Sequence, residues 1–151
     1  MGPQPVNRTS TPPPEAPELR RAAAPKRLLL AEDDEALRSL IAEALRKDGY
    51  QVVEVKHGLE LLELLEPAMF EGHPETRPDL IISDYHMPGC TGMSILAGVH
   101  STGLAVPFIV ITAFGDEATH QKARLLGAVA VLNKPFNLDE LRRTVQNLLP
   151  R

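Results

Sequence analysis

From residue 26 onward, short apolar runs alternate with stretches in which apolar residues recur at helical spacing. The continuous apolar run at 27–31 is typical of a strand covered on both faces, whereas the stripe within 34–47 indicates an amphipathic helix. The same patterns predict strands at 27–31, 50–55, 79–83, 106–111 and 129–133. They predict helices at 34–47, 58–65, 93–100, 116–126 and 138–149. This alternation predicts an α/β fold, a doubly wound five-stranded parallel sheet with helices on both faces.

Two stretches interrupt the alternation. Residues 1–25 are rich in proline and small or polar residues, and we interpret them as a disordered tail or linker. The segment 67–78 contains three prolines and a glycine, which predicts a long connection before the third strand. A tolerated surface insertion explains that connection more simply than a partner-specific loop does. The folded domain is therefore expected at 26–151.

Polar side chains stand at the ends of four of the predicted strands. Asp33, Asp84, Thr112 and Lys134 each come just after an apolar run. In open parallel sheets, ligands bind outside the carboxyl ends of the strands, so we expect these distant positions to meet in one pocket. Two carboxylates, a hydroxyl and an ammonium group suggest a divalent cation and a phosphoryl group.

Each of these residues also has an ordinary explanation when it is taken alone. Acids at 32–34 suit the first turn of a helix, and Asp34 is assigned only to that helix start. Thr112 is a β-branched residue at a strand end, and an isolated lysine such as Lys134 is usually solvated. Arg38, one turn into the first helix, is expected to be an ion-pairing surface residue. The joint placement of the polar residues at strand ends favours the functional interpretation.

The net charge of −4 combines a basic start with an acidic remainder. Residues 1–27 carry five basic and two acidic residues, a net charge of +3, which leaves −7 for the rest. An acidic body argues against nucleic-acid binding by this domain. The single cysteine, Cys90, excludes an intrachain disulfide and fits a reducing cytosol. No apolar run approaches the roughly 18 residues of a membrane span, so we expect a cytoplasmic protein without membrane contact.

Four segments resemble the receiver domains of two-component response regulators. They are 28–38 (LLLAEDDEALR), 79–89 (DLIISDYHMPG), 110–113 (VITA) and 133–136 (NKPF), in the family's order and with similar spacing. Gly92 stands where the family often has glycine. The resemblance covers about 26–149 and implies a CheY-like, flavodoxin-like sheet with strand order 2-1-3-4-5, an order for which this family is a standard example.

The resemblance implies a magnesium site. Glu32 and Asp33 would hold Mg²⁺, with Asp84 as a third carboxylate and the main-chain carbonyl of His86 as a further ligand. Magnesium prefers oxygen ligands and an octahedral arrangement, and Mn²⁺ is expected to substitute for it. A cation would also offset the repulsion among three clustered carboxylates.

The resemblance further implies that Asp84 accepts a phosphoryl group from a sensor histidine kinase or a histidine phosphotransfer protein. The carboxylate would attack phosphorus and form an acyl phosphate. Lys134 would pair with Asp84 and then with phosphoryl oxygens, and Thr112 would donate its hydroxyl to one of them. Pro135 is expected to follow a cis peptide bond. Such a protein assists its own Mg²⁺-dependent phosphorylation and dephosphorylation without being a conventional enzyme.

Two positions depart from the family pattern or bear on its chemistry. Val131 lies three residues before Lys134, where the family usually carries an aromatic residue that turns inward on phosphorylation. We therefore expect the readout of phosphorylation to depend on a surface other than the one around Val131, or on movement of the loop after Thr112. Phe114, two residues after Thr112, is expected to shield the acyl phosphate from water. The resemblance also allows a phosphorylation-dependent dimer, while the downstream target stays unknown.

The sequence leaves three alternatives to the phosphorylated receiver. The first is a pseudo-receiver, an interaction module that works without phosphorylation, and Val131 is its only support. The second is a phosphatase resembling haloacid dehalogenases, which usually carry an acid two residues after the nucleophile, where this chain has His86. The third is a flavin or nucleotide binder, which the lack of a glycine-rich loop after the first strand disfavours. A receiver could act as a single-domain regulator or as a piece of a larger protein.

Overall fold

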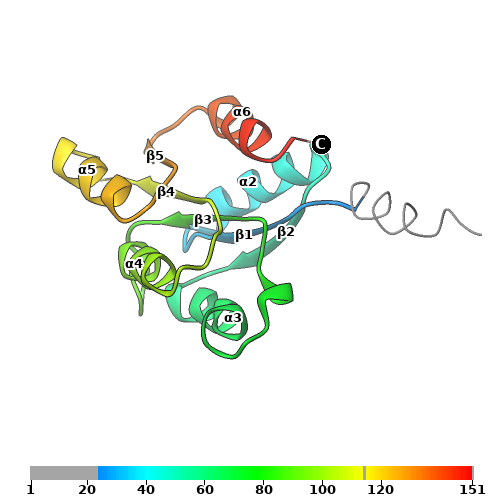
Figure 1. Ribbon diagram of the computed structural model, residues 1–151. Coiled ribbons are helices and arrows are strands. Elements are labelled where there is room, and N and C mark those ends of the chain that lie inside the picture. Colours follow the sequence, from blue (N-terminus) through cyan, green and yellow to red (C-terminus); the bar gives the residue numbers. More distant parts are fainter. Residues whose placement is uncertain (1–23, 114, 151) are drawn as a thin grey trace, which may run out of the picture.

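The computed structural model describes residues 24–113 and 115–150. Five parallel strands form one sheet in the order β2-β1-β3-β4-β5, and helices cover both of its faces (Figure 1). The strands are β1 (Arg27–Ala31), β2 (Gln51–Val55), β3 (Leu80–Asp84), β4 (Phe108–Thr112) and β5 (Ala130–Asn133). The helices are α2 (Glu35–Lys47), α3 (Gly58–Phe70), α4 (Gly92–Thr102), α5 (Glu117–Leu125) and α6 (Leu138–Leu148), with a short 3₁₀ helix η2 (Pro74–Thr76). The predicted fold and strand order are confirmed.

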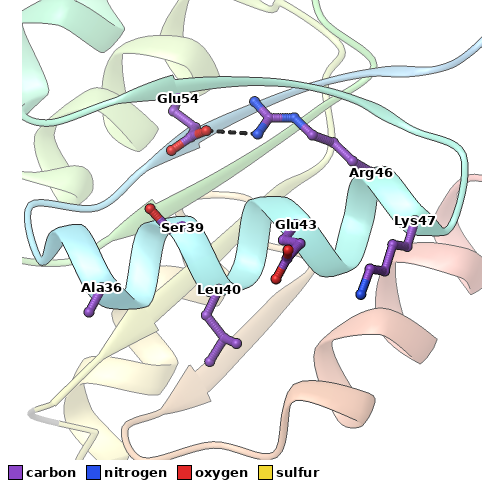
Figure 2. Close-up of a pocket in the computed structure, with 7 residues that line it drawn as sticks. All are labelled: Ala36, Ser39, Leu40, Glu43, Arg46, Lys47 and Glu54. Atoms are coloured by element: carbon purple, nitrogen blue, oxygen red, sulfur yellow. Dashed lines mark ion pairs between the residues drawn. The ribbon is translucent and has the colours of Figure 1, made fainter.

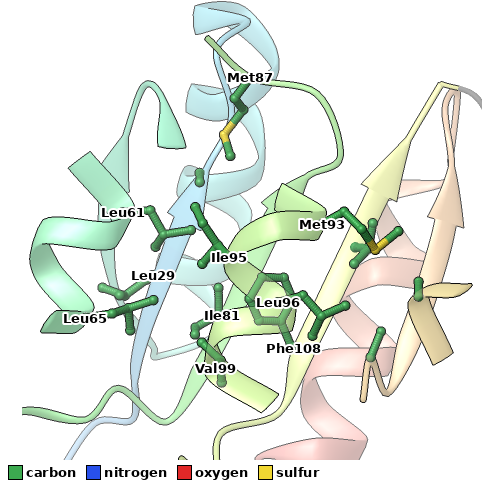
Figure 3. Close-up of a cluster of buried hydrophobic side chains, with 14 of the residues drawn as sticks. Leu29, Leu61, Leu65, Ile81, Met87, Met93, Ile95, Leu96, Val99 and Phe108 are labelled. Carbon is green, nitrogen blue, oxygen red and sulfur yellow. The ribbon is translucent and has the colours of Figure 1, made fainter. Parts of the chain in front are cut away.

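Each strand contributes side chains to two hydrophobic clusters, one on each face of the sheet. Leu29 and Ile81 point toward α3 and α4, where they meet residues such as Leu61, Ile95 and Leu96 (Figure 3). The neighbouring strand residues point the other way and pack against the buried faces of α2 and α6. Because successive side chains of a strand alternate between faces, a strand buried on both faces must be apolar throughout. This requirement explains the continuous apolar runs in the sequence.

The predictions of a short helix at 58–65 and of a long connection at 67–78 are wrong. Helix α3 continues to Phe70 with Pro67 inside it, and η2 occupies part of the segment that follows. Proline removes one helical hydrogen-bond donor, but Leu65 and Met69 on either side pack into the apolar cluster of that face. The carbonyl of Pro67 also accepts from the main-chain nitrogens of Glu71 (3.2 Å) and His73 (3.0 Å). Packing therefore carries the helix past the proline.

Other element boundaries differ from the expected ones by one or two residues, and two of these shifts matter for function. Asp84 is the last residue of β3 and Thr112 is the last residue of β4, so both are held within the sheet. The tail predicted at 1–25 lies outside the described residues except for its last two. Among the described residues, no helix combines the length and the hydropathy needed to cross a membrane.

Candidate functional site

The sheet brings the predicted site residues to its carboxyl edge. Parallel pairing aligns Asp84 with Ile111 and Thr112 with Asn133, so β3, β4 and β5 end side by side. Glu32 and Asp33 directly follow β1, which is the other neighbour of β3. The main-chain nitrogen of Lys134 donates to the carbonyl of Thr112 at 2.8 Å, which fixes the exit of β5 beside β4.

Three carboxylates gather at this edge. Glu32, Asp33 and Asp84 each offer an oxygen, and these oxygens all lie within 4.8 Å of one another. Glu32 is completely buried and Asp84 is 6% exposed, whereas Asp33 is exposed. A cluster of oxygen ligands with one side open to water suits Mg²⁺, which usually retains several water ligands. The predicted metal carboxylates are thus brought together.

The ammonium group of Lys134 lies between two of these carboxylates. Its Nζ is 2.8 Å from Oδ2 of Asp84 and 3.0 Å from Oε1 of Glu32. The contact with Asp84 is a hydrogen bond, whereas Oε1 of Glu32 is buried and meets the ammonium without hydrogen-bond geometry. One cation therefore faces two nearly buried carboxylates, and a buried oxygen without a hydrogen bond fits a site that binds a further cation.

Burial dominates the titration of Glu32. Desolvation raises the pKa of its carboxyl from 4.5 to about 7, and the nearby charge of Asp84 acts in the same direction. The main-chain N–H of Asp34 and the Lys134 ammonium lower the pKa but do not cancel the rise. Desolvation by itself lowers the pKa of Lys134, yet its contacts with Asp84 and Glu32 outweigh this and the net pKa is raised. The site therefore holds excess negative charge that a cation would stabilise.

The turn between β1 and α2 is fixed by its own polar groups. Oε2 of Glu32 accepts from the main-chain nitrogen of Asp34 at 3.0 Å, and the side chain of Asp34 caps α2 by accepting from the nitrogen of Leu37. The assignment of Asp34 to the helix start is confirmed. The ion pair expected of Arg38 is confirmed, since its Nε lies 3.3 Å from Glu54, but its expected surface position is wrong because it is only 7% exposed.

The loop after β3 is tied closely to Asp84. The main-chain nitrogen of His86 lies 3.4 Å from Oδ1 of Asp84, while the His86 residue itself is exposed. Gly92 begins α4 so close to β3 that an added Cβ would overlap the carbonyl oxygen of Asp84. Only glycine therefore fits at the start of α4 without displacing the loop. The role of the His86 carbonyl as a metal ligand stays a prediction.

Thr112 and the segment after Lys134 complete the edge. Thr112 is fully buried at the end of β4, and the role of its hydroxyl toward a phosphoryl group stays a prediction. The Lys134–Pro135 peptide is cis, as predicted. Val131 is buried on β5 in the cluster beneath α4 and α5. Phe114, the expected shield, lies outside the described residues.

Sequence reasoning missed one contact near this edge. Nε2 of His120, on α5, lies 2.8 Å from Oδ1 of Asn133, the residue before Lys134. Gly115 backs onto the same amide, because a Cβ added there would overlap the Asn133 side chain. The three residues link the start of α5 to the exit of β5. No motif signals this contact, since its partners are separated in the chain and the bond depends on tertiary placement.

Comparison with known proteins agrees with the fold and the site. The response regulator receiver domain model matches residues 28–146. Sporulation initiation phosphotransferase F of Bacillus subtilis is 31% identical over 125 residues, which cover 83% of this chain and 94% of that protein. Transcriptional regulatory protein PdtaR of Mycobacterium tuberculosis is 37% identical over 131 residues, and the match covers 86% of this chain but 60% of PdtaR.

Among solved structures, response regulator TrrA from Thermotoga maritima, in complex with Mg²⁺-BeF, is similar with a TM-score of 0.67 and 29% identity. That match covers 82% of this chain and 99% of TrrA. The chain belongs to the response regulator receiver domain family. The family and the acidic cluster together define a receiver of the kind used in two-component, phosphorylation-based signalling.

Proposed function

We propose that this chain is a phosphorylation-controlled receiver whose acceptor is Asp84 and whose donor is a phosphohistidine of a sensor histidine kinase or a histidine phosphotransfer protein. The observation that carries the proposal is the setting of Asp84. It lies at the sheet edge, is hydrogen-bonded to Lys134 at 2.8 Å and clusters with Glu32 and Asp33. A relative that is named a phosphotransferase and is matched over 94% of its length supports a place in a phosphoryl relay.

In the transfer step, a carboxylate oxygen of Asp84 attacks phosphorus and forms the new O–P bond. The P–N bond to the donor imidazole breaks, and its electron pair stays on that nitrogen. Lys134 neutralises charge on Asp84 and then on the phosphoryl oxygens, and the hydroxyl of Thr112 donates to one of those oxygens. Such transfer depends on positioning and charge neutralisation more than on covalent chemistry by the protein.

Glu32, Asp33, Asp84 and the main-chain carbonyl of His86 would hold the divalent cation. The three carboxylate oxygens within 4.8 Å of one another, and the buried Oε1 of Glu32 that lacks a hydrogen bond, fit such an ion. When bound, Mg²⁺ or Mn²⁺ supplies positive charge against the phosphoryl oxygens. The protein residues hold this arrangement in place before the donor arrives.

The site has a suitable approach for a protein donor. An open groove of about 540 Å³ lies beside Lys134 and is lined by apolar residues of α2 and of the segment before α6. They are Ala36, Leu37, Leu40, Pro135 and Phe136, together with Leu138 at the start of α6. Output then follows through protein–protein contacts of the receiver domain at 26–151, with a phosphorylation-dependent dimer as one form. PdtaR is matched over only 60% of its length, so the activity of its unmatched part is not attributed to this chain.

Intact mass spectrometry tests the proposal. The chain is incubated with Mg²⁺ and a small-molecule phosphodonor, with Asp84→Asn as an isosteric control. We expect the wild type to gain one phosphoryl group, the variant none, and a chelator to prevent the gain. A folded wild type that binds Mg²⁺ and stays unmodified would instead support the pseudo-receiver, an interaction module without the phosphorylation switch.

A further inference from the structure

Arg38 is a charged residue that the structure buries beside the proposed metal site without letting it touch the site's carboxylates. Its Nη1 donates to the main-chain carbonyl of Glu32 at 2.9 Å. Its Nε lies 3.3 Å from Oε1 of Glu54 on β2. A buried guanidinium is costly unless it is paired and hydrogen-bonded, so the position of Arg38 is set by these two partners.

The acidic partner of Arg38 is Glu54, which lies outside the carboxylate cluster of the site. Glu54 pairs with Arg38 and also with Arg46, whose Nη1 lies 2.9 Å from Oε2 of Glu54 (Figure 2). Within the site, Lys134 is the cation that lowers the pKa of Glu32. Arg38 therefore contacts the site through a main-chain carbonyl, whereas Lys134 contacts its carboxylates.

The carbonyl that Arg38 holds belongs to the peptide between Glu32 and Asp33. Because a peptide unit is planar, fixing this oxygen also fixes the main-chain nitrogen of Asp33 and restricts the direction of its side chain. The nitrogen of Glu32 donates to the carbonyl of Val55 at 3.2 Å. The end of β2 thus holds both main-chain groups of Glu32, one directly through Val55 and the other through Glu54 and Arg38.

We propose that Arg38 is a positioning residue for the metal carboxylates, because it ties the Glu32 carbonyl to Glu54 and so aims Glu32 and Asp33 into the cluster with Asp84. This inference rests on the proposed metal-dependent function. Groups that orient metal ligands commonly contribute 10- to 100-fold to metal affinity. Arg38 would do so through the geometry of the ligand set.

The sign of the effect separates positioning from simple electrostatics. Removing a cation near three carboxylates makes the surroundings more negative, which by Coulomb's law tightens Mg²⁺ binding. Removing a positioning group loosens the ligand set and weakens binding. Arg38→Met takes away both donors while it keeps an unbranched side chain in the buried space. Arg46→Met is the matched control, because Arg46 shares Glu54 but does not contact Glu32.

The experiment is calorimetric titration of the full chain with Mg²⁺, with thermal unfolding in chelator as a separate measure of stability. We expect Arg38→Met to raise the dissociation constant about tenfold and Arg46→Met to change it less than twofold. Glu54→Gln, which frees Arg38 from its anchor, is expected to weaken binding by a smaller factor, and it replaces Arg38→Met if that variant does not fold. A merely structural role would lower the unfolding temperature and leave the dissociation constant unchanged.

Three results would overturn the inference. They are unchanged or tighter Mg²⁺ binding by Arg38→Met, an equal loss in Arg46→Met, and, where Glu54→Gln is the variant used, an unchanged dissociation constant. Failure of the wild type itself to bind Mg²⁺ would overturn the metal role in the proposed function as well. Failure confined to the variants leaves that role standing.

Discussion

Helices α2 and α5 flank the same carboxyl edge of the sheet but are held very differently. Helix α2 buries residues along its length, ties its first turns to β2 through Arg38, and is held at its last turn by Arg142 of α6. Nη2 and Nε of Arg142 lie 2.8 and 2.9 Å from the carboxylate of Asp48. Within the described helix α5, Ala123 is the one buried residue, and Leu125 is 80% exposed. Figure 1 shows α5 at the end of the sheet that carries β4 and β5.

This difference suggests that the α2 side and the α5 side of the site have different roles. Two of the three proposed metal carboxylates, Glu32 and Asp33, precede α2, where both main-chain groups of Glu32 are fixed, so the proposed site is preorganised on the α2 side. Helix α5 is connected to β5 by the exposed contact between His120 and Asn133 and by packing of Ala123 and Val131 in one apolar cluster. Segments with few buried apolar contacts open and move at low free-energy cost. We therefore expect phosphorylation to leave α2 in place and to change α5.

The largest effect is expected from the ammonium that joins the two sides. Lys134→Met leaves the buried carboxylate of Glu32 and the nearly buried Asp84 without their cation, which should lower the free energy of unfolding by about 3 kcal/mol in chelator. Added Mg²⁺ should recover part of this loss. Urea unfolding measures it, with the exposed Lys122→Met on α5 as a control expected within about 0.5 kcal/mol. Equal effects of the two variants would contradict the comparison.

The α2 side should also carry the pH dependence of the metal-free protein. Folding raises the pKa of Glu32 from 4.5 to about 7, so the folded state binds more protons than the unfolded state between these values. The free energy of unfolding therefore falls as pH rises from about 4.5 to about 7, by at most about 3 kcal/mol from this group. Urea unfolding in chelator at several pH values measures the slope. Glu32→Gln should remove this component, and an unchanged slope would show that Glu32 is not its source.

On the α5 side, substitutions of buried and of exposed apolar residues should differ clearly in their effect on the free energy of unfolding. Val131→Ala removes buried methyl groups and should cost about 2 kcal/mol of unfolding free energy. Leu125→Ser changes an exposed side chain and should stay within about 0.5 kcal/mol. If signalling bypasses position 131, partner binding should survive Val131→Ala. Loss of partner binding in Val131→Ala, with no gain in Val131→Tyr, would contradict the expected readout by another surface or by the loop after Thr112.

The smallest effect is expected at the contact between α5 and β5. His120→Ala removes an exposed hydrogen bond to Asn133 and should lower the free energy of unfolding by about 1 kcal/mol or less. A double-mutant cycle with Asn133→Ala isolates the pairwise contribution. A coupling well above this value would show that α5 is held more firmly than its burial indicates.

The sequence was sufficient to predict the fold and the residues at the carboxyl edge of the sheet. It was insufficient to predict the tertiary contacts that hold those residues in place. The strand runs and the motifs around Asp84 and Lys134 are local signals, and parallel topology converts them into one site. Pro67 was read as a helix end because the packing of Met69 is not visible in a local pattern. Arg38 was assigned to the surface because its acceptor is a main-chain carbonyl, which any residue type could supply. The contact between His120 and Asn133 joins residues thirteen apart and likewise depends on tertiary placement.

Peptide-level hydrogen exchange followed by mass spectrometry tests the central claim most directly. The wild type and Asp84→Asn would be compared before and after treatment with Mg²⁺ and a phosphodonor, with the mass gain read in the same samples. The account predicts one phosphoryl group on the wild type at Asp84, altered exchange in peptides of α5 and the end of β5, and unchanged exchange in α2. Modification elsewhere, or exchange that changes in α2 but not in α5, would contradict it.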